Sequence, residues 1–437
     1  MKGTPQSEAA SRPRSEGAKR FIAAALLTAV FLFAFALSSS AHEPITTKVR
    51  FNKEVIRILQ RSCLGCHRPG GIAFSLTTYD EARPWAKAIK EEVLEKRMPP
   101  WHAVKGYGEF RNAPSFAQRD IDLLVNWVEG GAPKGEDRDL PEGPLFSDDW
   151  QLGKPDLVLK PESESDIAAD ADEFRTFGLS PSLKEDRWLT AIDLKPGNAS
   201  VVHCATIYYS VSDPVSGDSP EPNPGVKNTS MSHRSFLHPL ATWTPAQKTL
   251  AFGDGVGKLL PAGSCVSLKI HYRGSGEPAK DFTAVGLYFA KTPPRKRVEE
   301  LAIGNLDAVI LVAAEPQPVK SSLVLSNDTE AIAIRPLVHP LIVSLQATAY
   351  RPDGSQEVLI WTRSYQFDWE PTYYLKRPVV LLKGTRIEVI AYLNNSADNP
   401  NTPNDPPKQL RWSELTSEPL CTLSVAVNIH DTPATNR

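Results

Sequence analysis

Several patterns that mark common enzyme and nucleotide-binding classes are missing from this sequence. It contains no glycine-rich phosphate loop, no Gly-x-Ser-x-Gly nucleophile elbow, no His-Glu-x-x-His helix and no acidic calcium loop. The net charge is also close to zero, because the chain has 49 basic and 51 acidic residues. This balance argues against a nucleic-acid partner and against binding to an anionic membrane surface.

Cysteine and methionine are both scarce, with five and three residues in a chain of 437. Two cysteines belong to the run Cys-Leu-Gly-Cys-His at residues 63–67, which leaves an odd remainder of three. In an exported protein such a remainder predicts a free thiol, a metal ligand or a bridge to another chain. Cys204 is expected to bind a metal or to pair with Cys265 or Cys421, although Cys421 has the parity of a core residue.

The N-terminus has the pattern of an export signal. A basic leader, an apolar stretch at residues 21–37 and the small residues Ser39-Ser40-Ala41 follow one another. This order predicts a signal peptide or a membrane anchor over residues 1–41, and the small residues favour the cleaved signal. We therefore expect a periplasmic or otherwise exported protein, which contacts a membrane only through this segment if the segment stays uncleaved.

Residues 45–132 carry a helical pattern. Apolar residues recur at helical spacing in 51–61, 80–97 and 115–130, and Gly130-Gly131 ends the third stretch. Three short helices predict a small cytochrome-like domain, which gains much of its core from a bound haem. Residues 133–160 are rich in proline, glycine and charge, and we expect them to form a linker.

From residue 161 the hydrophobic period changes to two, which predicts strands. Turn signals separate the runs, and 38 prolines favour strands joined by surface loops. We expect two antiparallel, jelly-roll-like β-sandwiches at 161–294 and 295–437 that meet near Pro293-Pro294. The predicted fold class is thus multidomain, one small helical domain followed by two all-β domains. The expected strands are 188–194, 201–211, 265–272, 283–290, 331–334, 342–350, 358–363, 379–382, 386–393 and 421–429.

The Cys-x-x-Cys-His run has a direct chemical explanation. Two thiols at this spacing add across the two vinyl groups of haem, and the histidine that follows binds the iron. The run predicts covalent haem c on Cys63 and Cys66 with His67 as the proximal ligand; a redox dithiol is the alternative. For the sixth position we favour Met98, which precedes two prolines and would raise the reduction potential, over His102.

Motifs in both halves of the chain follow one another in a specific order. In the helical half they are residues 63–71, 78–79, 83–86 and 98–101. In the β half they are residues 196–197, 201–203, 261–263, 270–272, 285–287, 352–354, 367–369, 394–396 and 399–400.

Together these motifs resemble a family of exported bacterial proteins that fuse a c-type cytochrome to a type II copper monooxygenase module. The module is similar to peptidylglycine α-hydroxylating and dopamine β-monooxygenases, and the resemblance covers roughly residues 45–430. It implies two coppers on facing sandwiches across an open cleft. One copper has three histidine ligands and passes electrons, and the other has two histidines and a methionine and binds oxygen.

The electron-transfer copper of that family has a His-His pair and a later histidine. At these positions the present chain has His203, Cys204 and His271. Two imidazoles and a thiolate are a ligand set for electron-transfer copper. Period two places His271 on the strand face opposite Ile270 and Tyr272, so it is not simply a core residue. The alternative is that these histidines, with His339, are relics on a polar cleft wall.

The oxygen-binding copper of that family has a His-x-His pair and a later methionine. Here Leu337 stands at the first position, His339 at the second and Pro419 where the methionine is expected. One imidazole binds copper only weakly, so we do not expect this chain to have the oxygen activation that the resemblance implies. A substitute site is a further alternative, in the loop that holds Met231, His233 and His238.

These observations predict an exported c-type haem electron-transfer protein whose copper-monooxygenase-like module has lost its oxygen-activating copper. We expect its partner to be a redox protein or a small-molecule electron donor. Two alternatives stay open. The chain would be an oxidoreductase if it were an active, haem-fed copper monooxygenase, or it could be a binding or sensor module tethered to haem.

Overall fold

The computed structural model describes residues 46–114, 116–144, 146, 149–211, 238–245, 250–305, 308–336, 339, 341–363, 371–411 and 423–430. The predicted leader at 1–41 lies outside these ranges, as do Met231, His233, Leu337, Pro419 and Cys421. Within the described ranges, no helix is long and apolar enough to cross a membrane.

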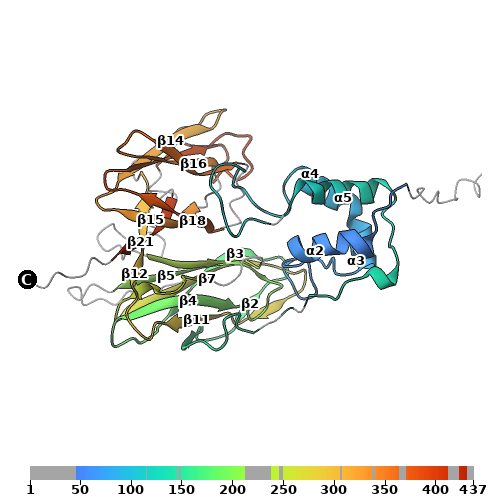
Figure 1. Cartoon of the computed structure of the whole chain (residues 1–437), viewed down its shortest axis with the longest axis horizontal. Coiled ribbons are helices and arrows are strands. Elements are labelled where there is room, and N and C mark those ends of the chain that lie inside the picture. The colour runs from blue at the N-terminus through green and yellow to red at the C-terminus, as the bar shows by residue number, and fades with distance from the viewer. Residues whose placement is uncertain are drawn as a thin grey trace, which may run out of the picture.

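The protein is mainly β, and its helices are gathered in an N-terminal part that projects from one side of the strands (Figure 1). Helical turns occupy all three stretches where the sequence predicts helices, so these predictions are confirmed. The second stretch is divided, because Pro84 begins a 3-10 turn between two α-helices. The elements are η1 (Phe51–Val55), α2 (Ile56–Ser62), α3 (Tyr79–Ala82), η2 (Arg83–Trp85), α4 (Ala86–Leu94), α5 (Gln118–Glu129) and η3 (Asp137–Asp139).

The helices pack around Trp127, a fully buried side chain on α5. Its ring lies 5.9 Å from the ring of Phe51, and its indole N–H donates to the Pro133 carbonyl at 3.1 Å. The backbone N–H of Phe51 donates to the same carbonyl at 3.0 Å. The first residues of the predicted linker are therefore bound to the helices.

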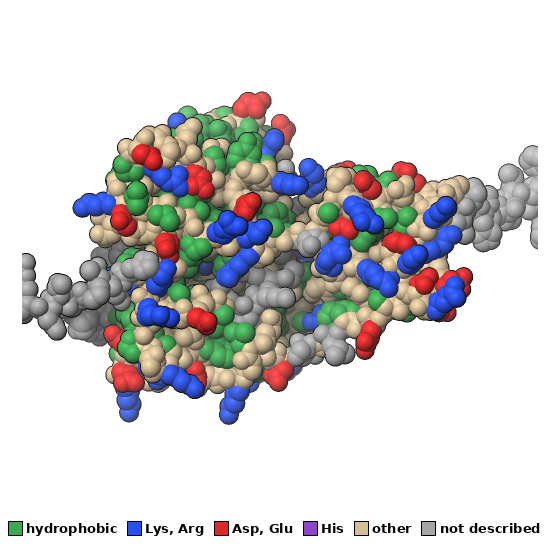
Figure 2. Space-filling model, in the orientation of Figure 1, with side chains coloured by type: hydrophobic (Ala, Val, Ile, Leu, Met, Phe, Trp, Pro, Cys, Tyr) green, Lys and Arg blue, Asp and Glu red, His purple; other side chains and the backbone are tan. Residues whose placement is uncertain are grey.

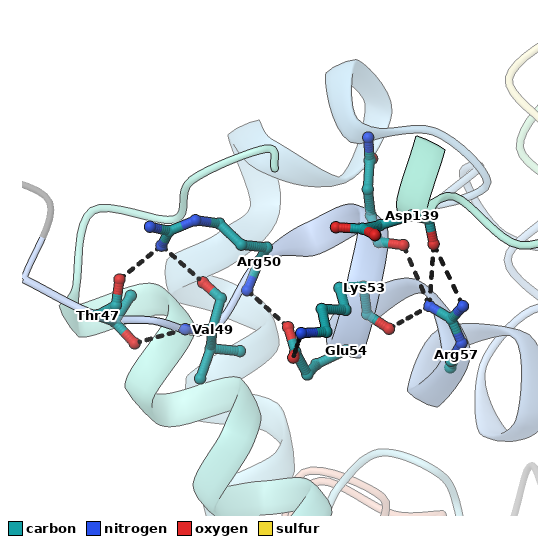
Figure 3. A network of polar contacts seen from close by, with 8 residues as sticks. Thr47, Val49, Arg50, Lys53, Glu54, Arg57 and Asp139 are labelled. Carbon is teal, nitrogen blue, oxygen red and sulfur yellow. Dashed lines mark hydrogen bonds and ion pairs between the residues drawn. The ribbon is translucent and has the colours of Figure 1, made fainter. Parts of the chain in front are cut away.

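A polar network ties α2 to the chain that leaves the helices (Figure 3). Arg57 on α2 donates from both terminal nitrogens to the Asp139 carbonyl, each at 3.2 Å. Just before η1, the Arg50 N–H donates to the Glu54 carboxylate at 2.9 Å, and its guanidinium donates to the Thr47 carbonyl at 2.5 Å. These bonds fix the entry and the exit of the helical part against each other.

The first β-sandwich consists of two antiparallel sheets that enclose an apolar core. One sheet has the order β3-β9-β5-β6, and the other begins β1-β11-β4-β8. Leu189, Ile207 and Leu268 are buried between them. The strands are β1 (Leu157–Leu159), β2 (Ser165–Ile167), β3 (Asp172–Leu179), β4 (Arg187–Lys195), β5 (Val202–Val211), β6 (His238–Trp243), β7 (Leu250–Ala251), β8 (Val256–Leu260), β9 (Ser264–Arg273), β10 (Ala279–Asp281) and β11 (Ala284–Phe289).

The second β-sandwich repeats this plan with the sheet orders β14-β19-β16-β17 and β12-β21-β15-β18. Its core includes Ile334, Leu345, Val389 and Val425, which are fully buried. The strands are β12 (Lys296–Ile303), β13 (Val309–Ile310), β14 (Gln317–Val324), β15 (Thr329–Pro336), β16 (Ile342–Tyr350), β17 (Gln356–Arg363), β18 (Tyr373–Leu381), β19 (Arg386–Leu393), β20 (Leu410–Arg411) and β21 (Leu423–His430).

The two sandwiches share a sheet. Strand β8 of the first pairs in parallel with β12 of the second, with Lys296 opposite Val256 and Arg297 opposite Gly257. One nine-stranded sheet therefore runs through both sandwiches, which lie one above the other in Figure 1.

A buried ion pair crosses this joint. Lys258 Nζ on β8 lies 2.9 Å from Glu300 Oε1 on β12, and the two side chains are only 5% and 11% exposed. Lys258 also donates to the Pro239 carbonyl at 2.6 Å, and the Ser424 hydroxyl donates to Glu300. Burial acts to raise the pKa of Glu300, but the nearby Lys258 and Arg335 outweigh it and hold that pKa below its usual range.

Between α4 and α5 the chain leaves the helices and runs along the second sandwich; we call residues 101–112 the arm. The Val104 N–H donates to the Trp361 carbonyl of β17 at 2.7 Å, and the Arg111 N–H donates to the Tyr374 carbonyl of β18 at 2.8 Å. Strands β17 and β18 are edge strands of different sheets. The arm therefore covers an edge that would otherwise leave backbone groups of both sheets unpaired.

Aromatic side chains attach the arm to the second core. The Trp101 and Phe110 rings lie 4.9 and 5.3 Å from the buried ring of Tyr373. Both side chains pack against the core cluster of the second sandwich. The sequence placed the arm within a helical domain at 45–132, whereas its packing partners belong to the second sandwich.

All ten expected strands are present, with ends shifted by a few residues in most cases. The other eleven strands of the described ranges were not expected; the longest of them are β3, β12 and β14, with eight residues each. Each of these three carries charged or polar residues at several positions, so its apolar alternation is weak. On the surface, basic and acidic side chains are interspersed over the face shown in Figure 2, in line with the near-zero net charge.

Candidate functional site

A β-bulge in the first sandwich brings three metal-binding side chains together. In the pairing of β5 with β9, Val202 lies opposite Tyr272 and Cys204 lies opposite His271, which leaves His203 as an extra residue. In a regular strand, neighbouring residues point to opposite faces of the sheet. A bulge places two residues opposite one and redirects their side chains. It thereby explains how His203 and Cys204 both reach His271.

The three side chains form a compact, buried cluster. One donor atom from each of His203, Cys204 and His271 lies within 4.8 Å of the other two. The two Nδ1 atoms of His203 and His271 are 3.2 Å apart. Imidazole nitrogens bind a metal ion such as zinc at about 2.0 Å, so two of them on one ion at a near-tetrahedral angle lie about 3.3 Å apart. The cluster predicted from the sequence is thus present, and its spacing fits one metal ion.

Two residues of the edge strand β3 hold His271 from the outside. Asp172 Oδ1 accepts a hydrogen bond from His271 Nε2 at 2.7 Å, and this bond holds the pKa of Asp172 below its usual range. The Phe174 ring stacks on the His271 ring at 4.3 Å, nearly parallel. The sequence did not identify either residue, because β3 was not expected. Residues 172–179 have only a weak apolar alternation, so this strand had little signal in the sequence.

No disulfide joins Cys204 to Cys265. Cys265 lies opposite Ser210 in the β5–β9 register, several residues along the ladder from Cys204, and its side chain is exposed. The predicted alternative of a bridge between these two cysteines is therefore wrong. Cys421 lies outside the described residues.

The second sandwich places His339 just after β15. Its Nδ1 accepts the Leu341 N–H at 3.2 Å, and burial lowers its pKa to about 4. In the part of the chain that the structure describes, the only group of three or more histidine, cysteine or acidic side chains with metal-site spacing is the cluster in the first sandwich.

His238 belongs to strand β6 rather than to a loop. Its ring stacks on Tyr209 at 4.9 Å, and burial lowers its pKa. The other two members of the predicted substitute site, Met231 and His233, lie outside the described residues.

The Cys-x-x-Cys-His run follows α2 and turns back on itself. His67 Nδ1 lies 3.0 Å from the Phe74 carbonyl, so this nitrogen carries the proton and donates it. Nε2 then has the lone pair that an iron ligand needs. Burial lowers the pKa of His67, which favours the neutral imidazole. The donor set fits a covalently bound haem.

An apolar face adjoins His67. The Phe74 ring lies 4.8 Å from the His67 ring and stacks on Trp85 at 4.2 Å. Phe74 and Trp85 are 46% and 44% exposed, which is high for large aromatic side chains in contact with each other. A flat apolar cofactor held by the neighbouring cysteines would cover such a face.

Burial raises the pKa of both thiols of the run. Together with the neighbouring Cys66 it raises the pKa of Cys63 to about 12, and it raises the pKa of Cys66 to about 11.

The structure separates the two candidates for the sixth iron ligand. Met98 follows α4, and its side chain is 42% exposed. His102 lies on the arm, is only 8% exposed, and its carbonyl accepts the Arg363 N–H of β17 at 3.1 Å. His102 is thus part of the second sandwich edge.

A cavity of about 180 Å³ lies between the two sandwiches. Leu240 and Phe252 come from the first sandwich, Arg335 and Tyr374 from the second, and Arg111 from the arm. The residues of the cluster, His203, Cys204 and His271, do not line this cavity, so the metal-site candidate and the cavity are separate.

Comparisons with known proteins assign no family. No family model matches the chain, and no curated protein matches it significantly. An allantoicase structure is 10% identical with a TM-score of 0.16, over 52% of this chain and 77% of that one. A structure of infectious bursal disease virus, Gx strain, is 11% identical with a TM-score of 0.18, over 67% and 76%. At these TM-scores the likeness carries no argument.

Proposed function

We propose that this chain is an exported electron-transfer protein with two redox centres, a c-type haem in the helical part and a copper ion in the first sandwich. The helical part serves as a small cytochrome c domain. The β part is a copper-monooxygenase-like module that keeps an altered electron-transfer site and lacks an oxygen-activating one.

The observation that carries the proposal is the hydrogen bond from His67 Nδ1 to the Phe74 carbonyl, next to two cysteines at haem-attachment spacing. It fixes the imidazole with Nε2 directed away from the backbone, as in histidines that bind iron. Cys63 and Cys66 supply the two thioether links. Phe74 and Trp85 would offer an apolar surface to the bound group. Haem bound in this way supplies one-electron chemistry.

The copper part rests on the composition and spacing of the cluster. Two imidazoles and a thiolate in a buried, three-donor arrangement are typical of electron-transfer copper sites. Cys204 would bind as the thiolate and release its proton, and His203 would bind after its proton moves from Nδ1 to Nε2. The two Nδ1 atoms would then bind with little change in their 3.2 Å separation. Small rearrangement between oxidation states is what an electron-transfer site requires.

Oxygen activation is not part of the proposal. It needs a second copper with an open coordination position. In the sequence, the three residues at the places of its family ligands are Leu337, His339 and Pro419. One imidazole whose Nδ1 already accepts a backbone hydrogen bond offers a single remaining nitrogen.

The haem part is tested on protein expressed with a cytochrome c maturation system. We expect haem to stay attached through denaturation, and Cys63→Ser with Cys66→Ser to abolish the attachment. Wild-type protein without covalent haem would contradict the proposal. Met98→Ala tests the sixth ligand: we expect a lower haem potential and loss of the thioether–iron absorption band, and an unchanged ferric spectrum would exclude Met98.

The copper part is tested by adding copper(II) to the haem-loaded protein. We expect an intense thiolate-to-copper charge-transfer band that disappears in Cys204→Ser. Cys265→Ser is the matched control, since its thiol lies on the same pair of strands but outside the cluster. A copper spectrum without the band would exclude Cys204 as a ligand.

A further inference from the structure

We propose that Asp172 is a positioning residue of the cluster: it holds His271 with Nε2 protonated and so directs Nδ1 toward the metal ion. This inference rests on the proposed copper site, and it assigns a role to a residue that belongs to none of the ligand positions.

The geometry defines a chain of hydrogen bonds through three side chains. Asp172 Oδ1 lies 2.7 Å from His271 Nε2, and His271 Nδ1 lies 3.2 Å from His203 Nδ1. A carboxylate only accepts, so the proton between Asp172 and His271 belongs to Nε2. In the neutral ring, Nδ1 of His271 is then the acceptor for the Nδ1–H of His203. The ring of His271 is thus oriented before any metal binds.

The position of Asp172 is set by the sheet. Phe174 is the cross-strand partner of His271 in the β3–β9 register, and Asp172 shares the face of Phe174 because side chains alternate along a strand. Phe174 covers one face of the imidazole, and Asp172 holds its outer nitrogen. Together they restrict both the tilt and the tautomer of His271.

Several basic side chains lie near this bond. Arg273 is the cross-strand partner of Asp172, and the hydrogen bond from His271 and the charge of Arg273 both lower the pKa of Asp172. Lys269 Nζ lies 5.0 Å from the centre of the Phe174 ring, and Arg175 forms an ion pair with Glu173 at 2.6 Å. Asp172 itself is 65% exposed, whereas His271 is 2% exposed. Removing the carboxylate therefore leaves the core packing of the first sandwich in place.

Metal-binding histidines commonly donate their second nitrogen to a carboxylate, and losing that partner typically lowers metal affinity by about 10–100-fold. The Asp172–His271 pair has this arrangement with Nδ1 as the binding atom. It also predicts a specific tautomer in the metal-free protein, which is a property that can be measured without any metal.

The test uses the full chain labelled with ¹⁵N-histidine, in wild type, Asp172→Ala, Asp172→Asn and the control Asp170→Ala. Asp170 is an exposed carboxylate two residues away. NMR reports the tautomer of His271 in metal-free protein, and titration with copper alone against a competing chelator reports affinity. We expect Nε2–H in wild type and control, and a mixed tautomer with about 10–100-fold weaker copper binding in Asp172→Ala. Asp172→Asn keeps an acceptor oxygen, so we expect it to retain most of the Nε2–H tautomer and most of the copper affinity.

Two results would overturn the inference: His271 protonated on Nδ1 in wild type, or an Asp172→Ala protein with an unchanged tautomer. Unchanged copper affinity in Asp172→Ala, with copper bound through His271, would overturn it as well. If wild type binds no copper, the proposed copper function fails, while the tautomer measurement still decides whether Asp172 orients His271.

Discussion

The two sandwiches have the same layered architecture and share one sheet. They differ in how their metal-binding side chains are arranged. In the first, a bulge in β5 brings His203 and Cys204 opposite His271. In the second, β15 also contains a register shift, near Ala331, but His339 lies beyond the strand without a described cluster. Among the described residues, only the first sandwich therefore brings together a group of side chains with metal-site spacing.

This comparison shows that the site depends on a few local features. Both sandwiches have an apolar core with many fully buried side chains. In the first sandwich, an irregular pairing coincides with metal-binding side chains. The edge strand β3 also holds one of those side chains from outside, through the bond between Asp172 and His271.

The comparison is tested most strongly by removing one histidine from each sandwich. We expect His271→Ala to lower copper affinity by more than the roughly 10–100-fold that loss of an outer hydrogen-bond partner causes. His339→Ala, the matched change in the second sandwich, should leave copper binding unchanged. Equilibrium dialysis with copper measures both. Equal losses in the two variants would show that both sandwiches bind the ion.

The joint between the sandwiches is tested by Lys258→Met, which keeps a side chain of similar length and leaves the buried Glu300 carboxylate without its ion-pair partner, with Arg335 as the remaining nearby cation. Breaking a buried ion pair in this way costs about 3–5 kcal/mol in the free energy of unfolding. Lys280→Met is the control, because Lys280 is 66% exposed and its ion pairs are worth at most about 1 kcal/mol. Denaturant unfolding measures both, and similar values for the two variants would contradict the importance of the joint.

The arm packs against the second sandwich, so we expect the stability of that sandwich to depend on the arm more than the stability of the first does. We expect Trp101→Ala to destabilise the protein by about 2–3 kcal/mol, below the range for a fully buried tryptophan because Trp101 is half-buried. Hydrogen exchange should speed up in β17 and β18 and stay unchanged in β5 and β9. Leu152→Ala, at an exposed position, is the control. Faster exchange in both sandwiches alike would mean that the arm has no specific role in the second.

The fold class was largely accessible from the sequence, because strong alternation in segments such as 201–211 and 342–350 reflects burial on one face. Edge strands with polar faces, such as β3, were missed because their pattern is set by the neighbouring strand. The docking of the arm was missed for a different reason. Its extended segment lies between two helices, and its contacts are with residues more than 250 positions away in sequence, such as Asn112 with Thr372.

The candidate site was accessible in part. The sequence identified His203, Cys204 and His271 through a resemblance, but alternation alone would have placed His203 and Cys204 on opposite faces. Only the bulge brings them together, and nothing in the local residue types predicts it. The Cys-x-x-Cys-His run could be identified from the sequence alone, because the spacing of its residues along the chain defines it.

The central claim is that the chain holds one haem and one copper, with the copper in the first sandwich. Elemental analysis of iron and copper in the purified, copper-equilibrated protein tests it most directly. The account predicts one copper per iron in wild type and none in the double variant His203→Ala, His271→Ala. Two coppers per iron in wild type, or a copper that remains in the double variant, would contradict it.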